Sequence, residues 1–177
     1  LAICLALANN FFEGFDALTK AKVDVNKVDQ HHYNYSALLV ASRFHNPKAM
    51  KTLIERKADV THTDRHGAGA LHYLLTSKNK KEELGSSVAL LLKHGVSLKK
   101  TKSEVRHLVG ATIPKEMTPL ALAAYRNHYG LHATIQKKQV AALERQESEE
   151  LIATNQELSQ TALDPYGHDE EMFRLAQ

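Results

Sequence analysis

The chain has 177 residues, of which 43% are hydrophobic and 24% are charged, and its formal net charge is +3. This length suits one or two domains with a real core, and no run approaches the ~20 apolar residues of a membrane helix. Cys4 is the only cysteine, which excludes an internal disulfide framework and is typical of a reducing, cytoplasmic compartment.

The opening LAICLALA is apolar but lacks the basic flank and the cleavage site of a signal peptide. We therefore expect the chain to begin inside a larger protein. Charge is unevenly distributed along it. Residues 139–177 carry nine acids and two arginines, a net charge of −7, which leaves +10 for residues 1–138. The sequence predicts a basic body and an acidic C-terminal segment.

Similar apolar stretches return along the chain. Their anchors are Ile3, Leu38, Leu71 and Leu120, at intervals of 35, 33 and 49 residues. After each of the first three anchors comes a second apolar stripe, followed by a closing phrase: KVDVN at 22–26, KADVT at 57–61 and GVSL at 95–98. An interval near 33 residues indicates a repeat of two helices that cannot bury its apolar face alone.

The fourth stretch, MTPLALAAYRNH at 117–128, has a clear helix start. A Thr118 hydroxyl can cap free backbone N–H groups, and Pro119 fits the first helical turn. Before the third stretch, DRHG at 64–67 predicts a turn in which Gly67 tolerates a positive φ.

The residues TPLALAAYRNH, GALHYLL and KADVT resemble the ankyrin repeat. The resemblance covers residues 1–138 and implies an all-α helix–turn–helix solenoid with β-turn fingers and a C-terminal helical extension. We expect four units at about 1–28, 29–63, 64–112 and 113–138, with 139–177 as an acidic extension or a degenerate fifth unit. Lys22 and Lys57 depart from the family, which prefers Gly there, at a cost of up to ~1 kcal/mol if φ is positive. By resemblance, His72 bridges loops through hydrogen bonds.

Extra residues fall at three places: two in the first finger at 29–36, about five at 76–87 and about eleven at 99–114. We expect loops there, because insertions in repeat arrays go into loops. The 99–114 segment contains apolar Val105, Leu108 and Val109, and we expect a short helix against the array or a contact for a partner. Residues 136–163 are strong helix formers without Gly or Pro and predict a long helix, with a partly disordered acidic tail as the alternative.

No catalytic motif is present, and we expect neither an enzyme nor a cofactor. His31, His32, His62 and His66 lie on neighbouring predicted fingers, so zinc is conceivable, but no compact chelating pair occurs on one element and we predict no metal. Basic residues cluster at 78–81 and 99–106. These clusters admit electrostatic binding of nucleic acid or an anionic membrane, although stacking aromatics are missing, and we do not expect nucleic acid as the partner.

The resemblance implies a module that binds another protein through its finger tips and inner helices, which form a concave surface. Carried over position by position, the candidates on the inner helices and the third unit's finger are Arg43, Phe44, Arg65, His66, Tyr125 and Arg126. Family positions around them are Ala8, Asn9, Thr63, Ala68, Thr76 and Ser77. The inserted finger residues beside them are His31, His32, Tyr33 and Tyr35. Aromatic residues and arginine dominate interface energetics, so Arg43, Phe44, Tyr125 and Arg126 are the expected anchors.

Two narrower hypotheses remain open for a monomeric, cytoplasmic module of this kind. Degenerate repeats with long insertions resemble bacterial effectors that act on proteins in the host cytosol. Alternatively, the repeats recruit substrates for a catalytic domain outside this chain.

Overall fold

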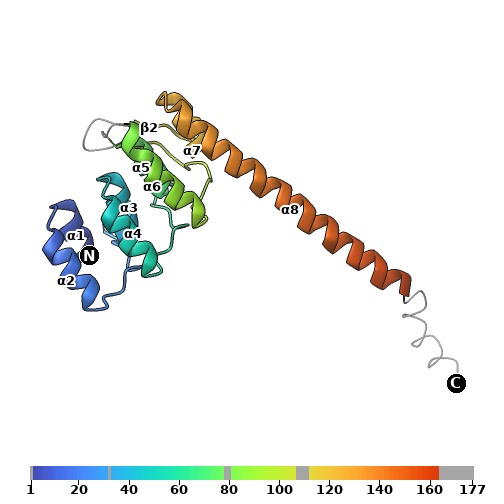
Figure 1. Cartoon of the computed structure of the whole chain (residues 1–177), viewed down its shortest axis with the longest axis horizontal. Helices are drawn as coiled ribbons and strands as arrows, with labels where there is room; N and C mark the ends of the chain where they lie inside the picture. The colour runs from blue at the N-terminus through green and yellow to red at the C-terminus, as the bar shows by residue number, and fades with distance from the viewer. Residues whose placement is uncertain (1, 32, 78–80, 107–111, 164–177) are drawn as a thin grey trace, which may run out of the picture. The chain divides into compact units, whose positions relative to one another are not determined.

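The computed structural model describes residues 2–31, 33–77, 81–106 and 112–163 (Figure 1). The described helices are α1 (Ala2–Ala8), α2 (Phe12–Lys20), α3 (Ala37–Arg43), α4 (Pro47–Glu55), α5 (Ala70–Thr76), α6 (Lys81–Lys93), α7 (Pro119–Tyr125) and α8 (Tyr129–Leu163). Two short strands, β1 (Val105–Arg106) and β2 (Thr112–Ile113), lie between α6 and α7. The chain divides into two compact units, Leu1–Lys137 and Lys138–Gln177.

Each inner helix packs on the next: α1 on α3, α3 on α5, and α5 on α7. Their starts follow the local sequence. The Ser36 hydroxyl accepts a hydrogen bond from Leu39 N at 3.3 Å, and the Thr118 hydroxyl accepts one from Ala121 N at 3.1 Å. Pro119 occupies the first turn of α7, as predicted.

A common turn joins the two helices of three units. Asn10, His45 and Asn127 occupy the same place in it, with φ of 54°, 45° and 57°. Asn and His are among the residues that enter the left-handed region most readily. The hydrogen bonds around these three residues are equivalent in the three units, so the turns place the paired helices in the same way.

A second common turn closes the outer helix of the first three units. Lys22, Lys57 and Gly95 have φ of 55°, 65° and 76° at equivalent places. In each unit the residue after the positive-φ residue donates its N–H to the carbonyl five positions earlier, as in a Schellman motif. Lys22 and Lys57 therefore do adopt the backbone conformation in which glycine is favoured.

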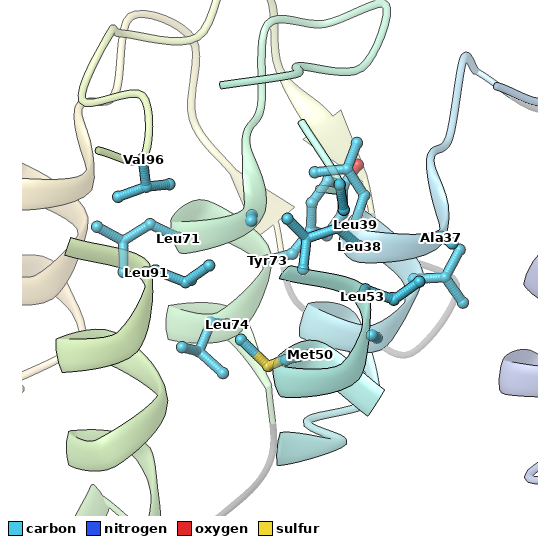
Figure 2. Close-up of a cluster of buried hydrophobic side chains, with 14 of the residues drawn as sticks. Ala37, Leu38, Leu39, Met50, Leu53, Leu71, Tyr73, Leu74, Leu91 and Val96 are labelled. Atoms are coloured by element: carbon cyan, nitrogen blue, oxygen red, sulfur yellow. The ribbon is translucent and has the colours of Figure 1, made fainter. Parts of the chain in front are cut away.

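The core lies between the stacked helix pairs. Figure 2 shows side chains of α3, α4, α5 and α6 meeting there, among them Leu53, Leu71, Leu74 and Leu91. These four leucines have no exposed surface. Both α3 and α5 are buried along most of their length, because neighbouring units cover them on two sides.

The 99–114 insertion forms paired strands rather than the predicted short helix. Val105 pairs with Ile113 in antiparallel register, and both side chains are buried. Thr101 anchors the insertion, since its hydroxyl donates to Pro114 O at 2.8 Å and accepts from Met117 N at 3.0 Å. Alternating burial along strands of two residues leaves too short a pattern to be recognised in the sequence. Leu108 and Val109 lie outside the described residues.

The 76–87 insertion is only partly a loop. Helix α6 begins at Lys81 and has 13 residues, whereas α2 and α4 have nine each. Part of the insertion therefore lengthens a helix, which good helix formers such as Lys and Glu allow. Our prediction of a loop was wrong for that part.

The predicted C-terminal helix is present as the later part of α8, which runs from Tyr129 to Leu163. Within residues 1–137, Ile135 on the first part of α8 is fully buried, so these turns supply the outer helix of unit four. The suggested fifth unit would need residues 164–177, which lie outside the described residues.

Candidate functional site

Two fingers, 29–35 and 64–68, begin on aspartates that organise the loop in the same way. Asp64 Oδ1 accepts hydrogen bonds from His66 N and Ala68 N, and Asp29 Oδ1 accepts one from His31 N. Asp64 N donates to Ala68 O, whereas Asp29 N donates to Tyr35 O. The finger at 29–35 is thus two residues longer, as the sequence indicated.

The two fingers are joined by hydrogen bonds from the later finger to the earlier one. Arg65 N donates to Tyr33 O at 2.9 Å, and Arg65 Nη2 donates to Gln30 O at 3.1 Å. His62, which lies just before the later finger, also donates from its Nε2 to Asn34 O at 2.8 Å. Tyr33 and Asn34 have φ of 60°, and these contacts hold the inserted backbone in that conformation.

Four residues on the two fingers form what we call the finger cluster: Tyr33, Tyr35, Arg65 and His66. The Tyr33 ring lies 6.0 Å from the Tyr35 ring and 5.5 Å from the His66 ring, between centroids. The Arg65 guanidinium carbon lies 5.8 Å from the Tyr33 centroid on a cation–π contact. Tyr33 is 50% exposed in spite of these contacts.

The 99–114 insertion contacts the finger cluster through hydrogen bonds to His66. Lys102 N donates to His66 O at 2.7 Å, and His66 Nδ1 shares a hydrogen bond of 2.7 Å with the Ser103 hydroxyl. An open pocket of about 210 Å³ lies here. Its lining consists of Tyr33, Tyr35, His66, Glu104, Val105 and Arg106.

Tyr35 of the cluster packs against the buried Tyr73, which is itself hydrogen-bonded to Asp64. The Tyr73 hydroxyl donates to Asp64 Oδ2, and the Tyr73 ring meets the Tyr35 ring edge-on at 5.7 Å. Burial, and then the nearby Asp64 carboxylate, raise the pKa of Tyr73 far above its usual value, so Tyr73 stays protonated and keeps donating. Tyr35 therefore has a buried and hydrogen-bonded neighbour beneath it.

His72 connects unit three to unit four, as the resemblance implied. Its Nδ1 accepts from Gly69 N at 3.1 Å and its Nε2 donates to Met117 O at 2.9 Å. Burial lowers the pKa of His72 below 6.5, which favours the neutral ring that these two bonds require.

Arg43 and Phe44 form a second group at the end of α3. The Arg43 guanidinium carbon lies 5.6 Å from the centroid of the exposed Phe44 ring. Among the described residues, no hydrogen-bond partner is present for the buried Nε of Arg43. In unit four the equivalent residues are Tyr125, which is exposed, and Arg126, which is half-buried.

The ten predicted site residues therefore fall into separate groups on different elements. The finger cluster brings four together, and Arg43 and Phe44 form a pair. Exposed His31 donates its backbone N–H to Asp29 Oδ1, and His32 lies outside the described residues. Two flanking family positions, Ala68 and Thr76, are corrected: both are buried, so they present almost no surface to a partner.

The sequence did not identify Ser103, which hydrogen-bonds to His66, or Glu104, which lines the pocket. Val105 and Arg106 were noted only as parts of an apolar and basic stretch. The insertion has no counterpart in the repeat, so no register assigned its residues to a finger. Gly67 is the residue in the sequence that bears on this contact. A Cβ there would lie 3.1 Å from Lys102 N, so a glycine at this position allows the insertion to approach the finger.

Among the described residues, no group of three or more His, Cys, Asp or Glu side chains is arranged to hold a metal ion. His62 and His66 are each hydrogen-bonded, to Asn34 O and the Ser103 hydroxyl. In the same part of the chain, no helix combines the length and apolarity needed to cross a membrane.

The fold is similar to the crystal structure of an ankyrin repeat domain from Acinetobacter baumannii AYE. The TM-score is 0.61 and the sequence identity is 22%, over 77% of this chain and 63% of that chain. No family model and no curated protein matches the sequence. The chain has the ankyrin-repeat fold, which confirms the predicted all-α, helical repeat architecture.

Proposed function

We propose that this chain is a non-catalytic module that binds another protein, and that the finger cluster is the centre of its contact surface. The observation that carries the proposal is Tyr33, a half-exposed aromatic side chain in contact with both Arg65 and His66. Tyr and Arg supply most of the energetic anchors in protein interfaces. An anchor that already contacts neighbouring side chains loses less conformational freedom on binding than a free one.

The pocket beside Tyr33 supports this proposal by its mixed chemistry. Val105 contributes a buried apolar wall, and Glu104 and Arg106 contribute charges at 3.6 Å from one another. Such a pocket fits a single partner side chain with a polar end better than a whole cofactor. Arg43 with Phe44, and Tyr125 with Arg126, would add contacts along the inner helices, on the expected concave surface.

The test begins with capture of partners by the intact chain from cytosolic lysate, after nuclease treatment and at two salt concentrations. The dissociation constant of the captured protein is then measured for Tyr33→Ala and Arg65→Ala. We expect each substitution to weaken binding by about tenfold or more, since anchor residues contribute about 2 kcal/mol or more. Phe12→Ala is the matched control, because Phe12 is a half-exposed aromatic residue on the outer helix α2, outside all three proposed contact groups.

Thermal unfolding of each variant keeps the result interpretable, because Arg65 also supports the finger through Gln30 O. Unchanged affinity for both finger variants would contradict the assignment of the cluster. The double variant Arg43→Ala/Phe44→Ala and the double variant Tyr125→Ala/Arg126→Ala then report whether the inner helices contribute.

Electrostatic binding to nucleic acid or to an anionic membrane is the competing function. Lys99, Lys100, Lys102 and Arg106 are exposed on the insertion, which favours it. However, Lys100 pairs with Glu116 and Arg106 pairs with Glu104, each at 3.6 Å, so part of this charge is compensated. Capture that disappears at the higher salt for every variant would favour the electrostatic function.

The two narrower hypotheses concern the kind of protein to which this module belongs. A bacterial effector and a substrate-recruiting arm both require a protein-binding surface, and they differ in the partner. The identity of the captured protein, a host protein or a substrate of an attached catalytic domain, separates them. The division at residue 138 into a repeat domain and an acidic extension stays a prediction.

A further inference from the structure

The pocket beside Tyr33 contains an ion pair between two of its lining residues, Glu104 and Arg106. Arg106 Nε lies 3.6 Å from Glu104 Oε1, and the two side chains are 83% and 47% exposed. An ion pair that water reaches to this extent contributes little to stability, because water competes for both charges. A ligand can therefore replace one member of the pair at a small cost.

Arg106 has more hydrogen-bonding capacity than this pair uses. A guanidinium carries five N–H donors and often binds a carboxylate through two of its nitrogens at once. The contact with Glu104 joins Nε to one carboxylate oxygen, and no other described residue forms an ion pair or a side-chain hydrogen bond with Arg106. Tyr33, half-exposed in the same pocket, carries a further O–H donor. The pocket therefore offers several donors to a ligand that accepts hydrogen bonds.

The exposed charges on the later finger and on the insertion that contacts it are mainly basic. Arg65, Lys99 and Lys102 are exposed, and no described acid forms an ion pair with any of them. The aspartates of the two fingers, Asp29 and Asp64, are buried and accept hydrogen bonds from backbone amides of their own loops. An excess of exposed positive charge attracts anionic groups and speeds their association.

A cationic ligand fits this pocket less well, although aromatic rings can bind cations. The chain's own Arg65 already lies 5.8 Å from the Tyr33 centroid, and Arg106 lines the pocket. Both guanidinium groups would repel a further cation. A phosphate group carries about two negative charges, so Glu104 repels it more strongly than it repels a carboxylate. The ligand that the pocket fits best is a single carboxylate.

We infer that this pocket receives the side chain of an Asp or Glu residue of a partner protein, and that Arg106 binds its carboxylate. In the free protein Glu104 occupies Arg106, and the carboxylate of the partner replaces it. The inference rests on the proposed function, because it names the chemistry of the partner at the same pocket.

The probe is a library of random peptides displayed on phage and selected for binding to the full chain. We expect the selected peptides to share one acidic position. Their dissociation constants are then measured by fluorescence anisotropy for the full chain, Arg106→Gln and Glu104→Gln. Arg106→Gln should weaken binding about tenfold, because a charge-assisted hydrogen bond is lost. Glu104→Gln should strengthen binding about threefold, because the competing carboxylate is gone.

Two controls separate this contact from the effect of overall charge. Lys93→Gln removes the same charge from the exposed end of the outer helix α6 and should leave the affinity nearly unchanged. In peptides whose shared acidic residue is replaced by its amide, the effects of Arg106→Gln and Glu104→Gln should both disappear. A substitution that only disturbed β1 would not act with opposite signs at residues 104 and 106.

Three results would overturn the inference. The selected peptides could lack a shared acidic position. The two substitutions could leave the affinity unchanged or shift it in the reverse directions, and the reverse shift would identify a basic ligand. Lys93→Gln and Arg106→Gln could also weaken binding equally, which would identify attraction by overall charge.

Tyr33→Ala, measured with the same peptides, distinguishes these failures from a failure of the proposed function. If Tyr33→Ala still weakens binding, the finger cluster remains the contact surface and only the carboxylate inference is wrong. If Tyr33→Ala also leaves the affinity unchanged, the proposed function of the cluster is wrong as well.

Discussion

At the scale of single residues, two buried polar side chains have different tasks: Asp64 shapes a finger within unit three, and His72 connects unit three to unit four. Asp64 accepts from two backbone amides and from the Tyr73 hydroxyl, so one carboxylate shapes a finger and binds the tyrosine that packs against Tyr35. His72 instead links unit three to unit four, because its Nε2 donates to Met117 O. Replacing Asp64 or His72 by a residue that cannot form these bonds leaves a buried polar group unsatisfied, which lowers the free energy of unfolding by about 1–3 kcal/mol.

We predict that acid destabilises the protein through His72. Burial lowers the pKa of this histidine in the folded state, so between that lowered value and about 6.5 the unfolded chain binds more protons. The contribution is complete above about pH 6.5 and is lost as the pH falls through the folded-state pKa. Urea unfolding of the wild type and of His72→Gln at pH 7.5 and 5.5 measures it. His72→Gln should be less stable at pH 7.5, and this difference should shrink at pH 5.5; an equal difference at both would contradict the assignment.

At the scale of elements, the closing turn of the outer helix recurs with different residues and the same geometry. Asp24 accepts from Asn26 N, Asp59 accepts from Thr61 N, and the Ser97 hydroxyl accepts from Lys99 N. Just before these turns, Lys22 and Lys57 have positive φ where unit three has Gly95. Hydrogen bonds specify the turn. In units one and two a lysine adopts the positive φ of this turn, which costs free energy that a glycine would not.

We predict that Lys57→Gly stabilises the protein by up to about 1 kcal/mol and that Gly95→Ala destabilises it by about 1–2 kcal/mol. The physical reason is the left-handed backbone, which a Cβ disfavours. Urea denaturation measures both changes. Lys51→Gly, within α4, is the control and should destabilise by about 0.5–1 kcal/mol, because glycine weakens a right-handed helix. A loss of stability in Lys57→Gly would refute this explanation.

At the scale of the whole molecule, the stability of a unit depends on how many neighbours it has. Leu18 and Leu53 occupy the same repeat position, but Leu18 is partly exposed and Leu53 is fully buried. In a stacked array each unit gains its core from adjacent units. An interior unit therefore contributes more buried surface per residue than an end unit.

We predict that Leu53→Ala lowers the free energy of unfolding by about 2–5 kcal/mol, the range for a fully buried leucine. Leu18→Ala should cost less than half as much, because part of its surface already meets water. Urea unfolding followed by circular dichroism checks both values on the same chain. Equal losses would mean that unit one is as well covered as unit two, which would contradict this explanation.

Much of the candidate site could be predicted, but not its arrangement. Tyr33, Tyr35, Arg65 and His66 were recognisable as finger residues, because the repeat register identifies fingers. Their mutual contacts depend on the φ values of a two-residue insertion and on hydrogen bonds between units. Glu104 lies in an insertion that the repeat register does not cover, so the sequence could not assign it to the site.

The sequence by itself determined the repeat, its helix starts and its turns. Each depends on residues within about 33 positions, such as the Thr118 cap and the positive-φ residues that close the outer helices. Only the tertiary structure decided the paired strands of the insertion, the pocket beside Tyr33 and the different burial of Leu18 and Leu53. These features depend on which separate segments meet, and burial is a property of neighbours that a local pattern does not contain.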